Sequence, residues 1–321
     1  MLRRAALVLL AVAAVAIGGW YFWLSREKPV RSGIGETTTT AAPPVKVIPS
    51  PVEAHSAPDS QSAEHPSLPS GISPAPVSPL ALAFESSSNL AQLVLELSPR
   101  AAAGDAQAAR VIAQALDECA TLSVRRGGTE GLDKFAEAMP PNRRNVALAH
   151  IAQYRERCAE LAKAEKMTPE RLREASHAGS LGNDLVDQAQ RVVESSTTMS
   201  EAEVKDTLRR IVQSRDARAI AIMADAMGQN PDDREIFGTK AGTHIYAMAW
   251  KLVACDLGMS CGPSSALVRQ GCVVYARCIP GDYREIVRFY LLTPSDYELT
   301  LGVEREILQD IADGGIDRLF P

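Results

Sequence analysis

The chain has 321 residues, an aromatic content of only 5% and a formal net charge of −5 at pH 7. An acidic chain without a basic block is a poor binder of nucleic acid or anionic lipid, because neutralised phosphates supply most non-specific affinity. Abundant Ala, Leu, Arg and Glu with few aromatic residues favour helices over sheets. We therefore expect an all-α protein that binds no nucleic acid.

The first predicted element is a membrane-spanning helix at residues 5–24, which carries no charged side chain. At about 1.5 Å per residue it spans roughly 30 Å, the thickness of the bilayer hydrocarbon. Trp20 to Trp23 form an aromatic cluster at its far end, where amphipathic rings favour the membrane interface. The pattern predicts an inner-membrane anchor behind a short cytoplasmic tail at residues 1–4.

A cleavable signal peptide is the alternative interpretation of this stretch. Such peptides have a shorter apolar core followed by small residues at the cleavage site. Here bulky aromatic residues precede the charged segment from Ser25 to Pro29, which favours a retained anchor. Basic residues flank both ends, so charge alone does not fix the orientation.

A linker follows at residues 25–79, where prolines interrupt a run of Ser, Thr and Ala. No apolar periodicity persists there, so the segment cannot bury enough surface to offset its ordering entropy. We expect a disordered tether with an r.m.s. reach of roughly 40 Å if it behaves as a flexible coil.

From residue 80 to 321 apolar residues recur at spacings of three and four, which is typical of packed helices. Ser200 and Glu203 form a capping box, and Asp216 and Thr293 are expected to begin two later helices. Pro99 is expected to end the helix that starts near Leu90, because the residue before a proline disfavours helical conformation. The expected domain has a sub-boundary near residues 230–242.

Two further expectations concern residues within this domain. The segment from Val273 to Tyr275 is its only β-like cluster. Glu118, which follows Asp117, is expected on a solvated helix face.

Three segments resemble the opening of Sel1-like or tetratricopeptide-type helical repeats, in which a small residue and Gly-Asp precede an Ala-rich helix. The segments are AAAGDAQAARVIAQAL (Ala101 to Leu116), HAGSLGNDLVDQAQ (His177 to Gln190) and SRDARAIAIMADAM (Ser214 to Met227). The resemblance implies stacked helix pairs. The second-helix signature of such repeats is absent, and an irregular helical domain is the alternative.

The chain has an even number of cysteines, and no two of them have the two-residue separation of a metal site. Behind a membrane segment, such a set favours disulfides in an oxidising compartment, which places residues 80–321 in the periplasm. The candidates are Cys119, Cys158, Cys255, Cys261, Cys272 and Cys278.

One predicted bridge joins Cys119 to Cys158 and clamps two long helices together. The last four cysteines pair either locally, as 255–261 and 272–278, or in a nested way, as 255–278 and 261–272. Local pairing is favoured because short loops have a high effective concentration. The surrounding WxxxxCDLGxxCG fragment (Trp250 to Gly262) resembles one in uncharacterised membrane-anchored proteobacterial proteins, a resemblance that implies no activity.

No nucleophile elbow, zinc, phosphate-loop or dinucleotide motif is present in the sequence, so we expect no catalytic, cofactor-binding or metal-ligating residues. One helical face combines His244, Met248 and Lys251 and would border a cleft. A partly exposed structural histidine is the alternative, because no carboxylate or nucleophile is placed beside His244 by spacing.

These observations favour a membrane-tethered periplasmic binding or scaffold protein that engages another protein or a polymer of the envelope. The alternative is a tethered periplasmic enzyme that acts on envelope material. The sequence does not indicate an oligomeric state.

Overall fold

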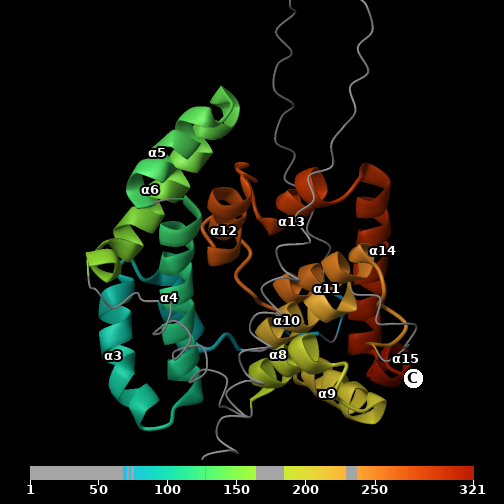
Figure 1. Ribbon diagram of the computed structural model, residues 1–321. Helices are drawn as coiled ribbons and strands as arrows, with labels where there is room; N and C mark the ends of the chain where they lie inside the picture. Colours follow the sequence, from blue (N-terminus) through green and yellow to red (C-terminus); the bar gives the residue numbers. More distant parts are fainter. Residues whose placement is uncertain (1–67, 71, 74–75, 127, 164–183, 229–236) are drawn as a thin grey trace, which may run out of the picture. The chain divides into compact units, whose positions relative to one another are not determined.

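The computed structural model describes residues 68–70, 72–73, 76–126, 128–163, 184–228 and 237–321 (Figure 1). The expected tail, anchor and most of the linker lie outside these ranges. Within them, no helix combines the length and the apolar character needed to cross a membrane.

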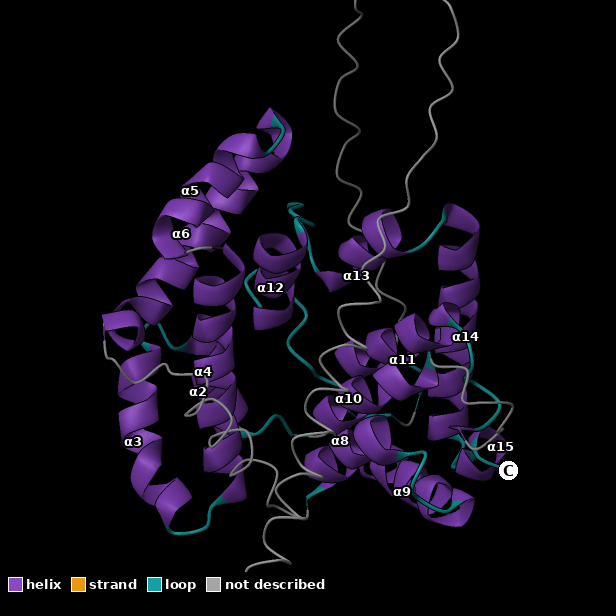
Figure 2. Cartoon of the chain, in the orientation of Figure 1, coloured by secondary structure: helices purple, strands orange, loops and turns teal. Residues whose placement is uncertain are grey.

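The described residues form helices and no strand, as the all-α prediction required (Figure 2). The elements are α2 (Pro79–Ser86), α3 (Leu90–Ala102), α4 (Ala106–Arg126), α5 (Gly128–Ala138), α6 (Pro141–Lys163), α8 (Leu185–Ser195), α9 (Glu201–Ser214), α10 (Ala217–Met227), α11 (His244–Asp256), α12 (Ala266–Tyr275), α13 (Tyr283–Ile286), the π-helical turn η2 (Val287–Leu291), α14 (Pro294–Ala312) and α15 (Ile316–Leu319).

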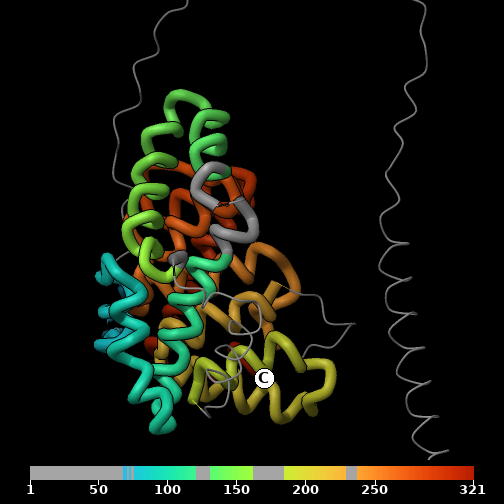
Figure 3. Tube along the Cα trace, turned by 60° about the vertical axis from the view of Figure 1, so that its left-hand side comes forward, coloured from blue at the N-terminus to red at the C-terminus, as the bar shows by residue number. Residues whose placement is uncertain are grey.

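The helices α2 to α6 share one core. Leu90, Ala115, Ile151 and Tyr154 are almost fully buried there, on the faces that three- and four-residue spacing predicts. Both ribbon and tube views show α3, α4 and α6 together (Figures 1 and 3). The predicted Cys119–Cys158 disulfide joins α4 to α6 within this core.

A second core gathers α8, α9, α10, α11, α14 and α15. Trp250 of α11 is fully buried and stacks on Phe320 near the C-terminus, with ring centroids 6.2 Å apart. The indole N–H of Trp250 donates to the carbonyl of Lys240 at 2.9 Å, which satisfies its one polar group. On its other side α11 contacts a smaller cluster that contains Met248 and Tyr283. Helix α11 is therefore buried on both sides.

The remaining two disulfides have the local pairing. Cys255, in the last turn of α11, bonds to Cys261 in the loop that follows, and Cys272 bonds to Cys278 across the end of α12. The nested alternative is therefore excluded.

The predicted helix starts at Ser200, Asp216 and Thr293 are confirmed. The Ser200 hydroxyl accepts from the backbone N–H of Glu203 at 3.3 Å, and the Glu203 carboxylate accepts from that of Ser200 at 2.9 Å. These two bonds form the complete capping box.

Pro99 does not end α3, which continues to Ala102, and this prediction was wrong. The proline lies in the last turn of α3. There it removes one backbone hydrogen bond but does not interrupt the middle of the helix. The Ser98 hydroxyl donates to the Val94 carbonyl at 2.6 Å, and the Asp105 N–H returns to the Arg100 carbonyl at 3.0 Å.

The β-like cluster from Val273 to Tyr275 is also helical, as the last turn of α12. Val273 is fully buried in the core of α2 to α6, so tertiary packing overrides the local preference of β-branched residues.

Candidate functional site

A cavity of about 900 Å³ opens between α2, α4, α8, α10 and α12. Its volume lies at the upper end of the range found for small-molecule sites, roughly 300–1,000 Å³. Its apolar lining includes Val77, Leu80, Val111, Val186, Met259 and Leu267. The cavity thus has a mixed wall, in which apolar residues alternate with many polar and charged ones.

The first turns of five helices line this cavity. The lining residues from these turns are Pro79 and Leu80 of α2, Gln107 of α4, Leu185 and Val186 of α8, Ala217 and Arg218 of α10, and Ala266 and Leu267 of α12. Each helix start carries a partial positive charge from its unpaired N–H groups. Helices α8 and α10 line the cavity only through their first turns, whereas α2 and α4 line it along much of their length.

Four of these helix starts are capped by side chains. Asp105 caps α4, Asp184 caps α8, Asp216 caps α10 and Ser265 caps α12. The fifth start, that of α2, has no side-chain cap, since the Ser78 hydroxyl makes no capping bond and proline follows it. The next two backbone N–H groups, of residues 80 and 81, remain without a protein acceptor among the described residues.

Two arginines lie on the cavity wall in different electrostatic situations. Arg110 of α4 is paired with Asp184 and with Asp187, to which it donates at 3.0 Å. The Arg218 guanidinium of α10 has no hydrogen bond or ion pair within the described part of the chain. Burial, followed by the charge of Arg110, lowers the pKa of Arg218 to about 10. Arg218 thus has no direct ion-pair partner among the described residues, although the charges of Asp216, Asp184 and Glu85 act to raise its pKa.

Gln114 supplies a second unsatisfied group. Its side-chain oxygen Oε1 is buried and has no donor among the described residues, although Gln114 lines the cavity. A buried acceptor without a partner loses roughly 1–3 kcal/mol relative to a bonded one. This oxygen has almost no accessible surface, so of these two groups only the Arg218 guanidinium is available to an occupant of the cavity.

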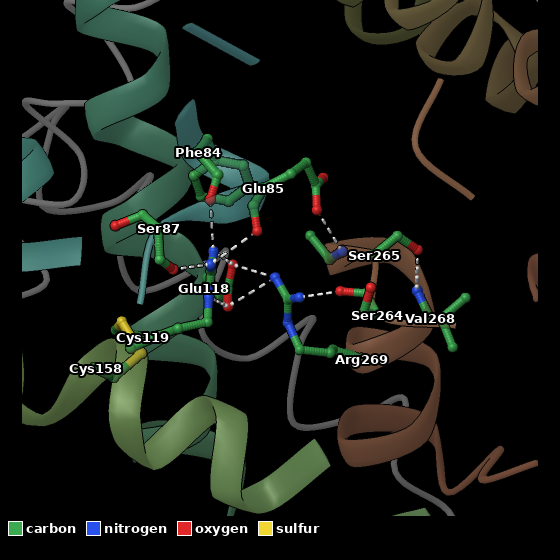
Figure 4. A network of polar contacts seen from close by, with 12 residues as sticks. Phe84, Glu85, Ser87, Glu118, Cys119, Cys158, Ser264, Ser265, Val268 and Arg269 are labelled. Carbon is green, nitrogen blue, oxygen red and sulfur yellow. Dashed lines mark hydrogen bonds and ion pairs between the residues drawn. A yellow bond between two sulfur atoms is a disulfide. The ribbon is translucent and has the colours of Figure 1, made fainter. Parts of the chain in front are cut away.

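The Glu118 carboxylate also reaches the cavity wall, where it forms a buried ion-pair network (Figure 4). Arg157 of α6 donates from Nε to Oε1 at 2.9 Å and from Nη2 to Oε2 at 3.1 Å. Arg269 of α12 approaches the same two oxygens at 3.4 and 3.5 Å. The expectation of a solvated Glu118 was wrong, because its side chain is only 6% exposed.

Arg157 also holds the C-terminal end of α2. It donates to the carbonyls of Phe84 at 3.0 Å and Glu85 at 3.3 Å, and to that of Ser87 (Figure 4). These carbonyls belong to the end of a helix, where they have no partner within the helix itself. A single guanidinium thus fastens α2, one wall of the cavity, to α4 and α6.

Glu85 fastens α2 to α12. Its carboxylate accepts from the backbone N–H of Ala266 at 3.0 Å, at the start of α12 (Figure 4). Burial raises the pKa of Glu85, while this hydrogen bond and the charges of Arg269 and Arg157 act in the opposite direction. The polar network therefore sets the position of three cavity walls.

The three residues predicted to border a cleft lie on α11, and none of them lines this cavity. His244 is exposed at the first position of the helix, and Met248 is buried against Tyr283 and its neighbours. Lys251 forms an ion pair with Asp225 at 2.6 Å.

Sequence reasoning missed the cavity, although α4 carried a signal for it. Gln107, Arg110, Gln114 and Asp117 recur at spacings of three and four, and all of them line the cavity. The helix is rich in Ala, and the prediction for it used only its apolar stripe, which packs in the core. A polar stripe of this kind usually faces solvent. Spacing by itself therefore does not distinguish a stripe that faces solvent from one that lines a cavity.

Within the described ranges no group of three His, Cys, Asp or Glu residues is placed to hold a metal ion. No family model, no curated protein and no solved structure matches the chain, so the residues of the cavity themselves are the basis for a function.

Proposed function

We propose that residues 80–321 form a periplasmic binding module that engages another component of the envelope, a protein or a polymer. One observation carries the proposal: a cavity of about 900 Å³ combines apolar wall segments with the Arg218 guanidinium, which has no direct hydrogen-bond or ion-pair partner among the described residues. In this proposal residues 5–24 anchor the module in the inner membrane, and residues 25–79 tether it.

The half-buried position of Arg218 supports binding. Leaving its guanidinium without a direct partner costs free energy that an occupant with a matching acceptor would recover. The walls formed by α2, α4 and α12 are fixed by the network of Arg157, Glu118 and Arg269, so little ordering of these three walls would be needed on binding.

Three disulfides support a periplasmic location, since such bonds persist in oxidising compartments and are rare in the cytosol. Tethering to the membrane would raise the local concentration of the module near envelope partners. A reach of roughly 40 Å would let it contact a target away from the bilayer surface.

The second candidate is a tethered enzyme, and one observation favours it. Glu85 lines the cavity, and burial raises the pKa of its carboxyl group, as a general acid requires. Its carboxylate is, however, already engaged by the Ala266 N–H. Turnover of an envelope substrate that is lost in Glu85→Gln would favour the enzyme over the binding module.

The binding proposal is tested by site-specific photo-crosslinking of the full chain in living cells. A photoreactive amino acid at Leu82, which lines the cavity and is 55% exposed, should give discrete adducts with one partner. Leu299, which is 58% exposed and lies outside the cavity lining, is the matched control and should give none. Equal adduct yields at both positions would contradict binding at the cavity.

A further inference from the structure

We propose that residues 68–70, 72–73 and 76–79 form a strap that controls access to the cavity, and that release of Ile72 from its core opens the cavity. This inference rests on the proposed binding function and gives that site its regulation. Three observations support it. The strap joins the two cores, it forms part of the cavity wall, and its two ends are held in very different ways.

The strap connects the two cores of the protein. Ile72 is 8% exposed and belongs to the core of α8, α9, α10, α11, α14 and α15, and Leu68 packs against the same core. Phe84, in the second turn of α2, is 5% exposed and belongs to the core of α2 to α6. The chain therefore passes from one core to the other between Ile72 and Phe84.

Between these two anchor points the strap forms part of the cavity wall. Pro76, Val77, Ser78 and Pro79 all line the cavity, and the lining continues along α2 as far as Glu85. Val77 is 42% exposed, so this part of the wall borders solvent. Movement of the strap away from the second core would remove one wall and widen the opening.

The end of the strap at Ile72 is held by apolar contact alone. The Ile72 N–H donates to the carbonyl of Pro69 at 3.2 Å, which is a bond within the strap. Among the described residues no hydrogen bond joins the strap to the second core. Burial of two apolar side chains must therefore offset the entropy of ordering the whole segment. Segments with so few contacts open locally before the rest of a fold.

The opposite end is held by a polar network. Arg157 donates to the carbonyls of Phe84 and Glu85, and the Glu85 carboxylate accepts from the Ala266 N–H at 3.0 Å. The start of α2, in contrast, has no side-chain cap. We therefore expect a hinge in α2 between its first turn and Phe84. In the proposed arrangement the membrane tether joins the strap at its weak end, so tension on the tether would act on Ile72 before it reaches α2.

The test measures hydrogen exchange of two backbone amides of the full chain in lipid nanodiscs. The Leu82 N–H donates to the Ser78 carbonyl and the Ser87 N–H to the Ala83 carbonyl, each at 3.0 Å. In Ile72→Asp the Leu82 amide should exchange at least about tenfold faster, since burial of an isoleucine side chain changes an equilibrium constant by about that factor or more. The Ser87 amide should keep its parent rate. Mass spectrometry with fragmentation of the peptides separates the two amides.

Two further variants locate the effect. Ser73→Asp adds the same charge at the neighbouring, exposed position and should leave both amides at their parent rates. Ile72→Ala shortens the side chain without adding charge and should give a smaller acceleration than Ile72→Asp. Photo-crosslinking at Leu82 should rise at least about twofold in Ile72→Asp, because apparent affinity follows the populated fraction of the open state. It should not change in Ser73→Asp.

Several outcomes would overturn the inference. They are equal acceleration at Leu82 and Ser87, which would indicate unfolding of the whole module, unchanged exchange at Leu82 in a folded Ile72→Asp variant, and the same acceleration in Ser73→Asp. Faster exchange with unchanged adducts at Leu82 would show that the strap opens without controlling the cavity. Each of these results would leave the binding function standing if the parent forms adducts. Absence of adducts in both parent and Ile72→Asp would remove the binding function and its regulation together.

Discussion

Arg157 of α6 holds Glu118 of α4 in a two-point ion pair, with both side chains almost fully buried and the Cys119–Cys158 disulfide at adjacent positions of the same helices (Figure 4). The arginine also donates to the carbonyls at the end of α2. One residue thus connects three helices around the cavity.

The first prediction is that Arg157→Met destabilises the protein by about 3–5 kcal/mol, the usual cost of removing one partner from a buried ion pair. Glu118 would keep only the longer contacts to Arg269, and the carbonyls of α2 would lose their donor. Urea unfolding followed by circular dichroism measures the change.

The matched control for this prediction is Arg155→Met, which changes an arginine of the same helix whose side chain is 38% exposed and paired with Asp133. Exposed pairs contribute about 0–1 kcal/mol, so this variant should unfold close to the parent. Equal losses in the two variants would show that the buried network contributes no more than a surface pair.

The contrast between these two arginines shows what the sequence could and could not predict. Helix positions and disulfide pairing followed from local information: apolar spacing, the capping box at Ser200 and the short separations of the last cysteines. The partners of Glu118 lie 39 and 151 residues away in the chain. No local pattern marks such a pair, so a charged residue beside Asp117 was placed in solvent. The cavity was missed for the same reason, since its walls come from five separate helices.

The second prediction concerns the disulfides. Replacing Cys119 and Cys158 together by Ala should cost about 4 kcal/mol in the chain-entropy model, because the bridge closes a loop of 39 residues. Replacing Cys272 and Cys278, which are separated by 6 residues, should cost about 2 kcal/mol on the same basis.

Denaturant unfolding of the two double variants tests the order of these losses. Peptide mapping under non-reducing conditions should recover the pairs 119–158, 255–261 and 272–278 from the mature protein. A larger loss for the shorter loop would contradict the entropic account, and a free Cys119 thiol would contradict the pairing itself.

The third prediction concerns the membrane anchor. A reporter enzyme that is active only in the periplasm, fused after Pro321, should be active, and the protein should fractionate with the membrane. Deletion of residues 1–24 should remove reporter activity, because no export signal would remain. A soluble product that begins between residues 25 and 35 would show a cleaved signal instead of an anchor.

The fourth prediction is a pH dependence of stability that arises at Glu304. This residue of α14 is fully buried, and its oxygens accept from Arg284 at 2.8 Å. The same arginine donates to Asp256 at 2.9 Å, so one cation faces two carboxylates. Burial raises the pKa of Glu304 to about 7, with the neighbouring Asp256 acting in the same direction. One proton is therefore held in this cluster near neutral pH.

Because the pKa of Glu304 is higher in the folded than in the unfolded state, the folded state binds the proton more tightly. The stabilisation is complete below about pH 4.5 and is lost as the pH rises through about 7. Glu304→Gln resembles the protonated side chain at every pH. We expect it to match the parent at low pH and to exceed it by about 3 kcal/mol above pH 8.

Urea unfolding of parent and variant between pH 4.5 and pH 8.5 measures this difference as a function of pH. Glu306→Gln is the control, since Glu306 lies two residues away with a side chain 61% exposed and paired with Lys240. Its stability curve should run parallel to that of the parent, because other carboxyl groups titrate equally in both. A Glu304→Gln curve that also runs parallel would mean that Glu304 stays ionised beside Arg284. The arginine would then outweigh burial and Asp256, and the cluster would be a permanent ion pair that does not titrate near neutral pH.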